Sequence, residues 1–348
     1  MRAALRPRGQ VEELGTAEAA ALWDALPAAL RAPGLHPAYL EADALREPGL
    51  GPVRWLYREG QALCCHGFHL APLPGEAGEA GWRDLQSPYG YGGPLVHPWP
   101  PPPGFLERVW AAHRAWCAER RVLAEFLRFH PLLPGAEAYG GEVRGDRDTV
   151  WVDLAAGPEG WRGAYQGRAR TALRKARRLG LTVAWWGPGP FLEAFAPLYA
   201  AHMERLGAHP DYRFPRPYLE ALVRWPAALR GVILDPEGRV VAAALFLAEG
   251  EVLEYHLAAD RPEGRAAGAP TLLLDAAFER GAELGLRRAH LGGGRGPDPA
   301  DALLRFKTAF SPRRARYRTG RWVHRPEAYE ALRRRWPRPR PGRVLFYR

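Results

Sequence analysis

The sequence predicts an α+β protein of two similar domains in tandem, each a mixed, mostly antiparallel twisted sheet flanked by helices. The 348 residues are 47% hydrophobic and 11% aromatic, which is enough to fill two cores of ordinary size. The second half alternates strand and helix patterns in a regular order, and the first half repeats this order more weakly.

The second half begins with a strand at 181–186, followed by two helices and then three strands with tight turns at Asp235–Gly238 and Glu249–Gly250. Pro270 suits the first turn of the next helix and Gly285 its end. The elements expected after the opening strand are helices at 190–206 and 215–225, three strands within 230–260, a helix at 270–285, a strand at 287–291, a helix at 300–310 and a strand at about 313–318. This is the element order of the GNAT acyltransferase fold.

The first half gives the weaker copy: helices near 16–31 and 36–46, a hairpin at 53–58 and 61–71, a helix at 105–120 and a strand at 122–130. The Gly-rich, charged stretch 134–148 marks the boundary. We therefore expect domains at 1–140 and 148–320 and a basic segment at 321–348, in which a helix at about 326–336 packs back on the first domain.

The formal net charge of +11 is concentrated in residues 312–348, which hold thirteen arginines and two glutamates. Such asymmetry indicates an anionic partner, RNA or a phosphate-bearing ligand, although arginine-rich surfaces are also typical of heat-adapted proteins. No apolar run reaches the about 20 residues that span a bilayer, and the N-terminus lacks a signal-peptide pattern, so we expect a cytoplasmic protein. The basic C-terminus could contact a membrane surface peripherally, and the sequence indicates no oligomeric state.

The chain has three cysteines, Cys64, Cys65 and Cys117, with no CxxC pair and no Cys/His ligand spacing. The sequence therefore predicts no metal site. Packing as small buried hydrophobes is the expected use of Cys64 and Cys65.

Five segments, in this order, resemble the FemABX family of aminoacyltransferases that build the interpeptide bridges of peptidoglycan. They are "DLQSPYGYGGPL" (84–95), "EFLRFHPLL" (125–133), "RARTALRKARRLGLTV" (168–183), "EYHLAAD" (254–260) and "HLGGG" (290–294) with "LLRFKTAF" (303–310). The resemblance implies a twin-GNAT enzyme of cell-wall biogenesis that transfers an amino acid from aminoacyl-tRNA to an amine of a nucleotide- or lipid-linked muropeptide. The long helical-hairpin insertion that some members carry is missing.

Lys307 is one of only two lysines in a chain with 49 Lys and Arg residues. It shares a helical stripe with Leu303, Phe306 and Phe310, so its charge emerges from an otherwise apolar face. Its stem could cover core while the ammonium reaches water. The resemblance instead implies that Phe306 and Lys307 are catalytic, with Lys307 stabilising the oxyanion of the tetrahedral intermediate and Phe306 stacking on the terminal adenine or packing in the core.

The helix at 168–178 is densely cationic on one side, which suits either a solvated face or a track along an RNA backbone. The residues predicted to bind RNA are Arg168, Arg170, Arg174, Lys175 and Arg178.

The acceptor is expected to contact residues of two segments and one loop, because arginine binds pyrophosphate by paired hydrogen bonds and tyrosine flanks sugar or peptide. These candidates are Arg213, Arg216, Tyr218, Tyr255, His256, Tyr89 and Tyr91. His256 could accept a proton, but the sequence does not single out a general base.

No cofactor is predicted, and acetyl-CoA is disfavoured. GNAT enzymes hold the CoA pyrophosphate on backbone amides at a helix start, and here that slot reads Arg265-Ala-Ala-Gly268-Ala269-Pro270, in which Pro270 removes one donor. Two alternatives stay open: a CoA- or carrier-dependent N-acyltransferase acting on a surface polysaccharide or small amine, and a non-catalytic RNA-binding protein.

Overall fold

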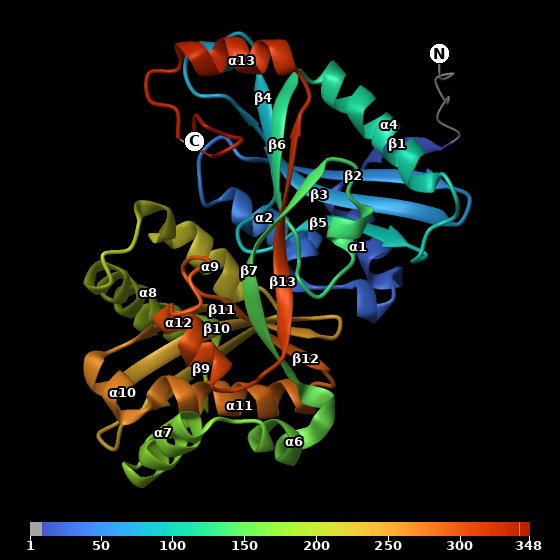
Figure 1. Cartoon of the computed structure of the whole chain (residues 1–348). Helices are drawn as coiled ribbons and strands as arrows, with labels where there is room; N and C mark the ends of the chain where they lie inside the picture. The colour runs from blue at the N-terminus through green and yellow to red at the C-terminus, as the bar shows by residue number, and fades with distance from the viewer. Residues whose placement is uncertain (1–8, 341) are drawn as a thin grey trace. The chain divides into compact units, whose positions relative to one another are not determined.

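The computed structural model describes residues 9–340 and 342–348, and the chain divides into two compact units (Figure 1). Among these residues, the first unit holds 9–26, 34–146, 317–340 and 342–348, and the second holds 27–33 and 147–316. No helix within the described ranges is both long enough and apolar enough to cross a bilayer.

The sheet of the first unit has the strand order β1-β2-β3-β4-β6-β13, and β5 also pairs with β3. The β4–β6 pair is parallel and the others are antiparallel. A parallel pair needs a crossover, which contains helix α4. The strands are β1 (Gln10–Glu13), β2 (Gly51–Glu59), β3 (Ala62–Pro72), β4 (Arg83–Gln86), β5 (Gly93–His97), β6 (Val122–Arg128) and β13 (Arg314–Val323).

Helix α4 (Phe105–Glu119) fills the core of the first unit, because Phe105, Val109, Ala112 and Trp116 recur at helical spacing and are all buried. A second cluster joins β6 to the C-terminal residues, where the Tyr329 hydroxyl donates to the Val344 carbonyl at 2.7 Å. The other helices are α1 (Thr16–Ala25), α2 (Pro37–Ala44), α3 (Glu76–Glu79), α5 (Gly135–Ala138) and α13 (Pro326–Arg335).

The second unit repeats this plan with the strand order β7-β12-β11-β10-β9-β8, in which β11–β12 is the parallel pair. The β9–β10 turn forms because the Asp235 carboxylate accepts the amides of Glu237 and Arg239, while Gly238 takes φ 79°. The strands are β7 (Glu142–Asp153), β8 (Thr182–Trp185), β9 (Ala228–Leu234), β10 (Val240–Glu249), β11 (Val252–Asp260) and β12 (Arg288–Gly293).

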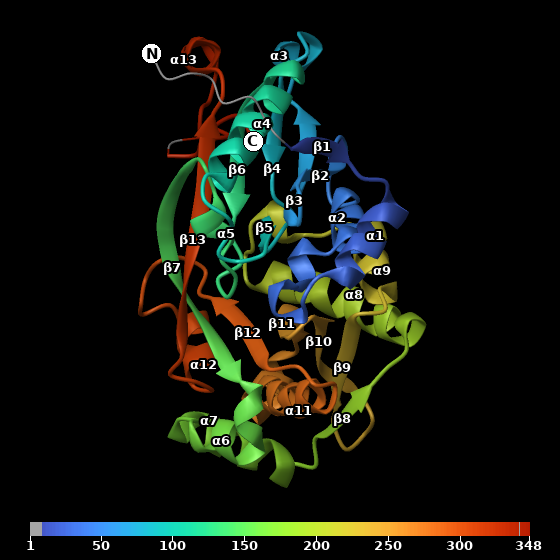
Figure 2. The ribbon, with the colours of Figure 1, turned by 90° about the vertical axis from the view of Figure 1, so that its right-hand side faces the viewer.

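Helices cover both faces of this second sheet, with α11 on one face and α8 on the other (Figure 2). Alternate residues of β10, namely Ala242, Ala244 and Phe246, belong to the core that includes α11, as expected of a strand buried on both faces. The helices are α6 (Gly157–Gly163), α7 (Gly167–Arg178), α8 (Pro188–Arg205), α9 (Arg216–Arg224), α10 (Pro262–Ala267), α11 (Ala269–Glu283) and α12 (Ala302–Thr308), and short 3-10 turns lie at Ala28–Leu30, Pro33–Leu35, Leu154–Ala156 and Pro210–Tyr212.

The predicted α+β class and the element order of the second half are confirmed. Some boundaries were wrong. The helix expected at 16–31 ends at Ala25, just before Pro27, and the last strand runs on to Val323. The stretch 134–148, predicted to contain the domain boundary, holds α5 and the start of β7, and the two units divide within it, between Asp146 and Arg147. The C-terminal residues from Tyr317 onward lie in the first unit.

Candidate active site

Lys307 is buried on α12, with only 7% of its surface exposed. Asp301 caps this helix, since its carboxylate accepts the Leu304 amide at 2.9 Å. The Lys307 ammonium donates to the Gly293 carbonyl at 2.7 Å, at the end of β12. A bulge in the β12–β7 ladder, with Gly292 at φ 73°, interrupts the strand just before that carbonyl. Lys307 is therefore held at the end of a strand and does not extend into solvent.

Burial lowers the pKa of Lys307 to about 8; Asp301 and Glu254 oppose this shift, and Arg147 adds to it. The side chain is thus mostly an ammonium at neutral pH. One of its three N–H groups donates to the Gly293 carbonyl. Because the ammonium is buried, its charge acts on a nearby negative charge more strongly than it would in water.

The apolar stripe predicted around Lys307 is only partly present. Phe310 is fully buried and Phe306 partly buried, with ring centroids 5.4 Å apart, but Leu303 is 38% exposed. The helix expected at 300–310 begins only at Ala302, which leaves Leu303 in its first turn at the surface.

Two buried polar residues near this site were missed by the sequence analysis. Glu254 on β11 and His290 on β12 are register partners in the parallel pair, and the Glu254 carboxylate lies 3.3 Å from Nδ1 of His290. They are 6% and 1% exposed. The sequence feature that could have identified them is a polar residue at a position where the alternating pattern of the strand predicts a buried side chain.

Of the predicted acceptor residues in the second unit, the structure brings Tyr218 and His256 together. The Tyr218 hydroxyl lies 3.4 Å from Nε2 of His256, and Tyr218 is fully buried. Tyr255 is half-buried and packs on Phe246, with centroids 5.5 Å apart.

The two predicted arginines lie on the surface of the second unit. Arg213 is exposed, and Arg216 is exposed and forms an ion pair with Glu193.

Tyr89 and Tyr91 lie on a fixed loop of the first unit. The Tyr89 amide donates to the buried Asp43 carboxylate at 3.1 Å, and the Tyr89 carbonyl accepts the Tyr39 hydroxyl at 2.7 Å. The Tyr91 ring makes an edge contact with Tyr317 at 5.6 Å. Glycines on both sides of Tyr91 allow this path, since Gly90 and Gly93 have φ of 82° and 105°.

The cationic helix is α7, as predicted, and it buries Ala169, Leu173 and Ala176. Arg168 donates to the Thr308 hydroxyl at 3.0 Å, which ties α7 to α12, and the neighbouring Arg177 pairs with Asp275 at 3.1 Å. Four exposed cations on this helix have no carboxylate partner within residues 9–340 and 342–348: Arg170, Arg174, Lys175 and Arg178.

The segment that corresponds in sequence to the CoA pyrophosphate loop, Arg265–Pro270, makes contacts within the protein. The Arg265 guanidinium pairs with Asp260 at 3.1 Å. Gly268, at φ 88°, lies so close to α7 that a Cβ there would be 2.6 Å from the Ala172 carbonyl oxygen. A carbonyl oxygen at this helix start is an unfavourable neighbour for a phosphate.

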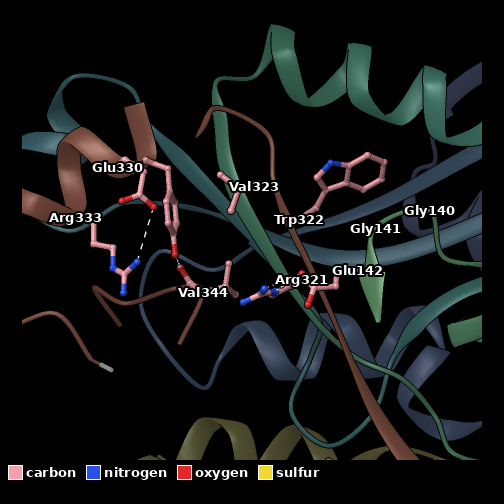
Figure 3. A pocket seen from close by; sticks show the side chains of 10 residues that line it. Gly140, Gly141, Glu142, Arg321, Trp322, Val323, Glu330, Arg333 and Val344 are labelled. Atoms are coloured by element: carbon pink, nitrogen blue, oxygen red, sulfur yellow. Dashed lines mark hydrogen bonds and ion pairs between the residues drawn. The ribbon is translucent and has the colours of Figure 1, made fainter. Parts of the chain in front are cut away.

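The first unit has a hollow of about 560 Å³ bordered by Gly140–Glu142, Arg321–Val323 and the C-terminal region (Figure 3). Its charged groups already pair with one another: Arg321 with Glu142 at 2.7 Å, and Arg333 with Glu330 at 3.8 Å. None of the site residues predicted from the sequence lines it, so we do not assign chemistry to this hollow.

Residues 164–308 match the model of the acetyltransferase (GNAT) domain. This match lies within the second unit, and the predicted enzyme class, an acyltransferase, is confirmed.

The fold of the chain resembles that of FemX. The crystal structure of FemX matches it with a TM-score of 0.71 and 13% identity, over 93% of this chain and 99% of that one. The C-terminal domain of a putative lysylphosphatidylglycerol synthetase from Agrobacterium fabrum gives a TM-score of 0.54 and 15% identity, over 88% of this chain and 92% of that chain. The structure of L-PGS from Bacillus licheniformis gives 0.51 and 14%, over 83% and 93%. No curated protein sequence matches. These likenesses confirm the predicted FemABX-like, twin-GNAT fold.

Proposed function

We propose that this acyltransferase moves an aminoacyl group from aminoacyl-tRNA to an amine on the stem peptide of a peptidoglycan precursor. The observation that carries the proposal is the buried ammonium of Lys307 at the end of β12, in a GNAT domain whose cationic helix α7 is tied to α12 through Arg168. The five FemABX-like segments and the FemX-like fold support the same class of reaction.

In this reaction the acceptor amine attacks the ester carbonyl, a tetrahedral intermediate forms, and the bond to the ribose oxygen breaks as that oxygen takes up a proton. Negative charge develops on the former carbonyl oxygen. The Lys307 ammonium stabilises it, and removal of one such donor typically costs about 3 kcal/mol of transition-state stabilisation. The amine proton can pass to the departing hydroxyl, so this chemistry needs no protein base.

The choice of tRNA as donor rests on charge. Within the arginine-rich residues 312–348, several arginines already form ion pairs with carboxylates. These are Arg313, Arg316, Arg318, Arg321 and Arg348. The cations of α7 that lack such partners are free to neutralise phosphates. The contacts of Arg265 and Gly268 weigh against acetyl-CoA.

The acceptor is assigned as a muropeptide on the FemABX-like segments. The putative lysylphosphatidylglycerol synthetase of similar fold is named for a lipid product, so the headgroup of phosphatidylglycerol is the acceptor to test against the muropeptide.

The test incubates the full chain with a mixture of labelled aminoacyl-tRNAs and, in separate arms, a nucleotide-linked muropeptide, a lipid-linked muropeptide and phosphatidylglycerol vesicles, with mass spectrometry of the acceptor. We expect a mass increase of one or more aminoacyl groups on a muropeptide. A fourth arm replaces the tRNA with acetyl-CoA. Acetylation in that arm, with no transfer from tRNA, would overturn the proposal, as would aminoacylation of the lipid alone.

A further inference from the structure

Four potential metal ligands converge inside the first unit, away from any residue assigned a role above. Two come from α4, where positions i and i+4 share one face, one from β6, and one follows directly after β13. Their ligand atoms all lie within 4.8 Å of one another. We call this the His-Cys-Glu cluster: His113, Cys117, Glu125 and His324.

The distances in the cluster fit a tetrahedral ion. The Oε2 atom of Glu125 lies 3.0 Å from Nε2 of His113 and 3.2 Å from Nε2 of His324, and Sγ of Cys117 lies 3.5 Å from the same His113 nitrogen. Around a tetrahedral zinc with ordinary bond lengths, a ligand nitrogen and a ligand oxygen are about 3.4 Å apart, and a nitrogen and a sulfur about 3.6 Å apart. The observed values are slightly shorter than these, so a small shift of the side chains is enough to place an ion between them.

The contact of Cys117 is the weakest of the cluster, since its sulfur lies 3.5 Å from Nε2 of His113 while that nitrogen lies 3.0 Å from Glu125. With an ion at the centre, each of the four atoms would direct a lone pair to one point.

The surroundings match a structural ion. The side chains of His113, Cys117 and Glu125 are fully buried, and that of His324 is 4% exposed. The Tyr139 hydroxyl donates to the other oxygen of Glu125, which orients the carboxylate as outer partners of metal ligands do. The rings of Trp55 and Trp110 lie 5.3 Å from His113 and exclude water.

We propose that the His-Cys-Glu cluster binds one structural zinc ion, with four protein ligands and no open position, and so fastens α4 and the residue after β13 to β6. The thiolate and two imidazoles select zinc over harder cations, and four protein ligands leave no place for a substrate. This role is independent of the aminoacyl transfer proposed above.

The test uses the untagged full chain, purified without chelators. Elemental analysis by mass spectrometry is expected to give about one zinc per chain. After exchange with cobalt, the protein should show the strong visible bands of tetrahedral Co²⁺ and a thiolate-to-cobalt charge-transfer band. Removing the ion should lower the melting temperature by about 5 °C or more, because the ion binds only the folded chain.

Cys117→Ala should abolish the charge-transfer band. Cys64→Ala is the matched control, since Cys64 is also fully buried in this core but lies outside the cluster, and it should keep the band. A folded wild-type chain that binds neither zinc nor cobalt overturns the proposal, and so does a charge-transfer band that survives in Cys117→Ala. If Cys117→Ala does not fold, alkylation of the wild-type chain decides: Cys117 should be modified faster after the ion is removed, and equal rates with and without zinc count against the site.

Discussion

Two of the buried carboxylates, Asp275 in the second unit and Glu125 in the first, are neutralised in different ways. In the second unit Asp275, on α11, receives two hydrogen bonds from Arg162 at 2.9 and 2.8 Å and one from the Tyr165 hydroxyl at 2.9 Å. In the first unit Glu125 faces two histidines and a thiol, and no arginine contacts it within the described residues. Burial disfavours its charge, yet His113 and His324 hold the pKa of Glu125 well below its usual range.

Asp275 therefore belongs to a salt bridge, whereas Glu125 belongs to a group of potential metal ligands. The Arg162 side chain is 31% exposed, so it stays charged and partly hydrated while it satisfies Asp275. The side chains around Glu125 are enclosed, and the two imidazoles and the thiol are groups that can bind a metal ion. Asp275 is therefore neutralised without an ion, in the unit that also holds Lys307, the buried cation that we assign to chemistry. Glu125 lies in the first unit, in the cluster to which we assign a structural role.

Lys307→Met gives the largest expected effect and would sharpen this division of roles. It should lower kcat for aminoacyl transfer by about 10² to 10³, the usual result of losing one oxyanion donor. The melting temperature should stay constant or rise, because methionine keeps the volume and removes a buried charge. Steady-state kinetics and a melting curve measure both.

Lys307→Arg is the accompanying variant. It should fail to restore the rate, because the planar guanidinium does not fit where the ammonium contacts the Gly293 carbonyl. Near wild-type turnover in Lys307→Arg, or a large loss of stability in Lys307→Met with little change in rate, would make Lys307 a packing residue.

Asp275→Asn tests the salt-bridge half of the comparison. It should reduce the free energy of unfolding by about 3 kcal/mol in a urea titration, because it removes the buried anion that pairs with Arg162 and leaves that guanidinium only the exposed Glu279. Glu283→Gln is the control on the same helix. Its pair with Arg280 is exposed, and the change should be within about 1 kcal/mol. Equal effects of the two variants would show that burial adds nothing at Asp275.

The cationic face of α7 belongs to the second unit alone, and reversing two of its charges should affect RNA binding and not folding. Arg170→Glu with Arg174→Glu is expected to weaken tRNA binding roughly tenfold at low salt and to flatten the salt dependence of the dissociation constant. The matched control reverses Arg224 and Arg280, which are exposed in the same unit but already pair with acids. An unchanged dissociation constant, or an equal loss in the control, would assign α7 to a solvated face.

The sequence predicted well whatever depends on local pattern. Alternating apolar residues and the Asp235 turn located β9, β10 and β11, and helical spacing located α7 and α11. Lys307 could be recognised because it is a charged residue on a helical stripe whose other members are apolar. Its partner Gly293 lies 14 positions away, and no periodicity shows which carbonyl a bulged strand presents.

The His-Cys-Glu cluster shows what local pattern cannot reveal. His113 and Cys117 are one helical turn apart, but Glu125 follows on another element and His324 is 199 positions further along the chain. The ligand-spacing rule predicted no metal site because it looks for neighbours in sequence. Only the pairing of β13 with β6, which aligns Trp322 with Glu125, brings His324 to the cluster.

The smallest expected effect is a pH dependence with opposite signs in rate and stability. Lys307 has a pKa of about 8 in the folded chain, with Asp301, Glu254 and Arg147 as the charged groups that act on it, against about 10.4 for an unfolded lysine. The ammonium is present below the folded pKa, so the rate should fall about twofold by pH 8 and further above it. Between pH 8 and about 10.4 the unfolded chain binds more protons at this position, so Lys307 should make the folded state more stable as the pH rises. A rate that falls while stability rises therefore separates loss of the ammonium from alkaline unfolding, and Lys307→Met should remove both slopes. If the residual rate of Lys307→Met shows the wild-type pH profile, a different group is titrating.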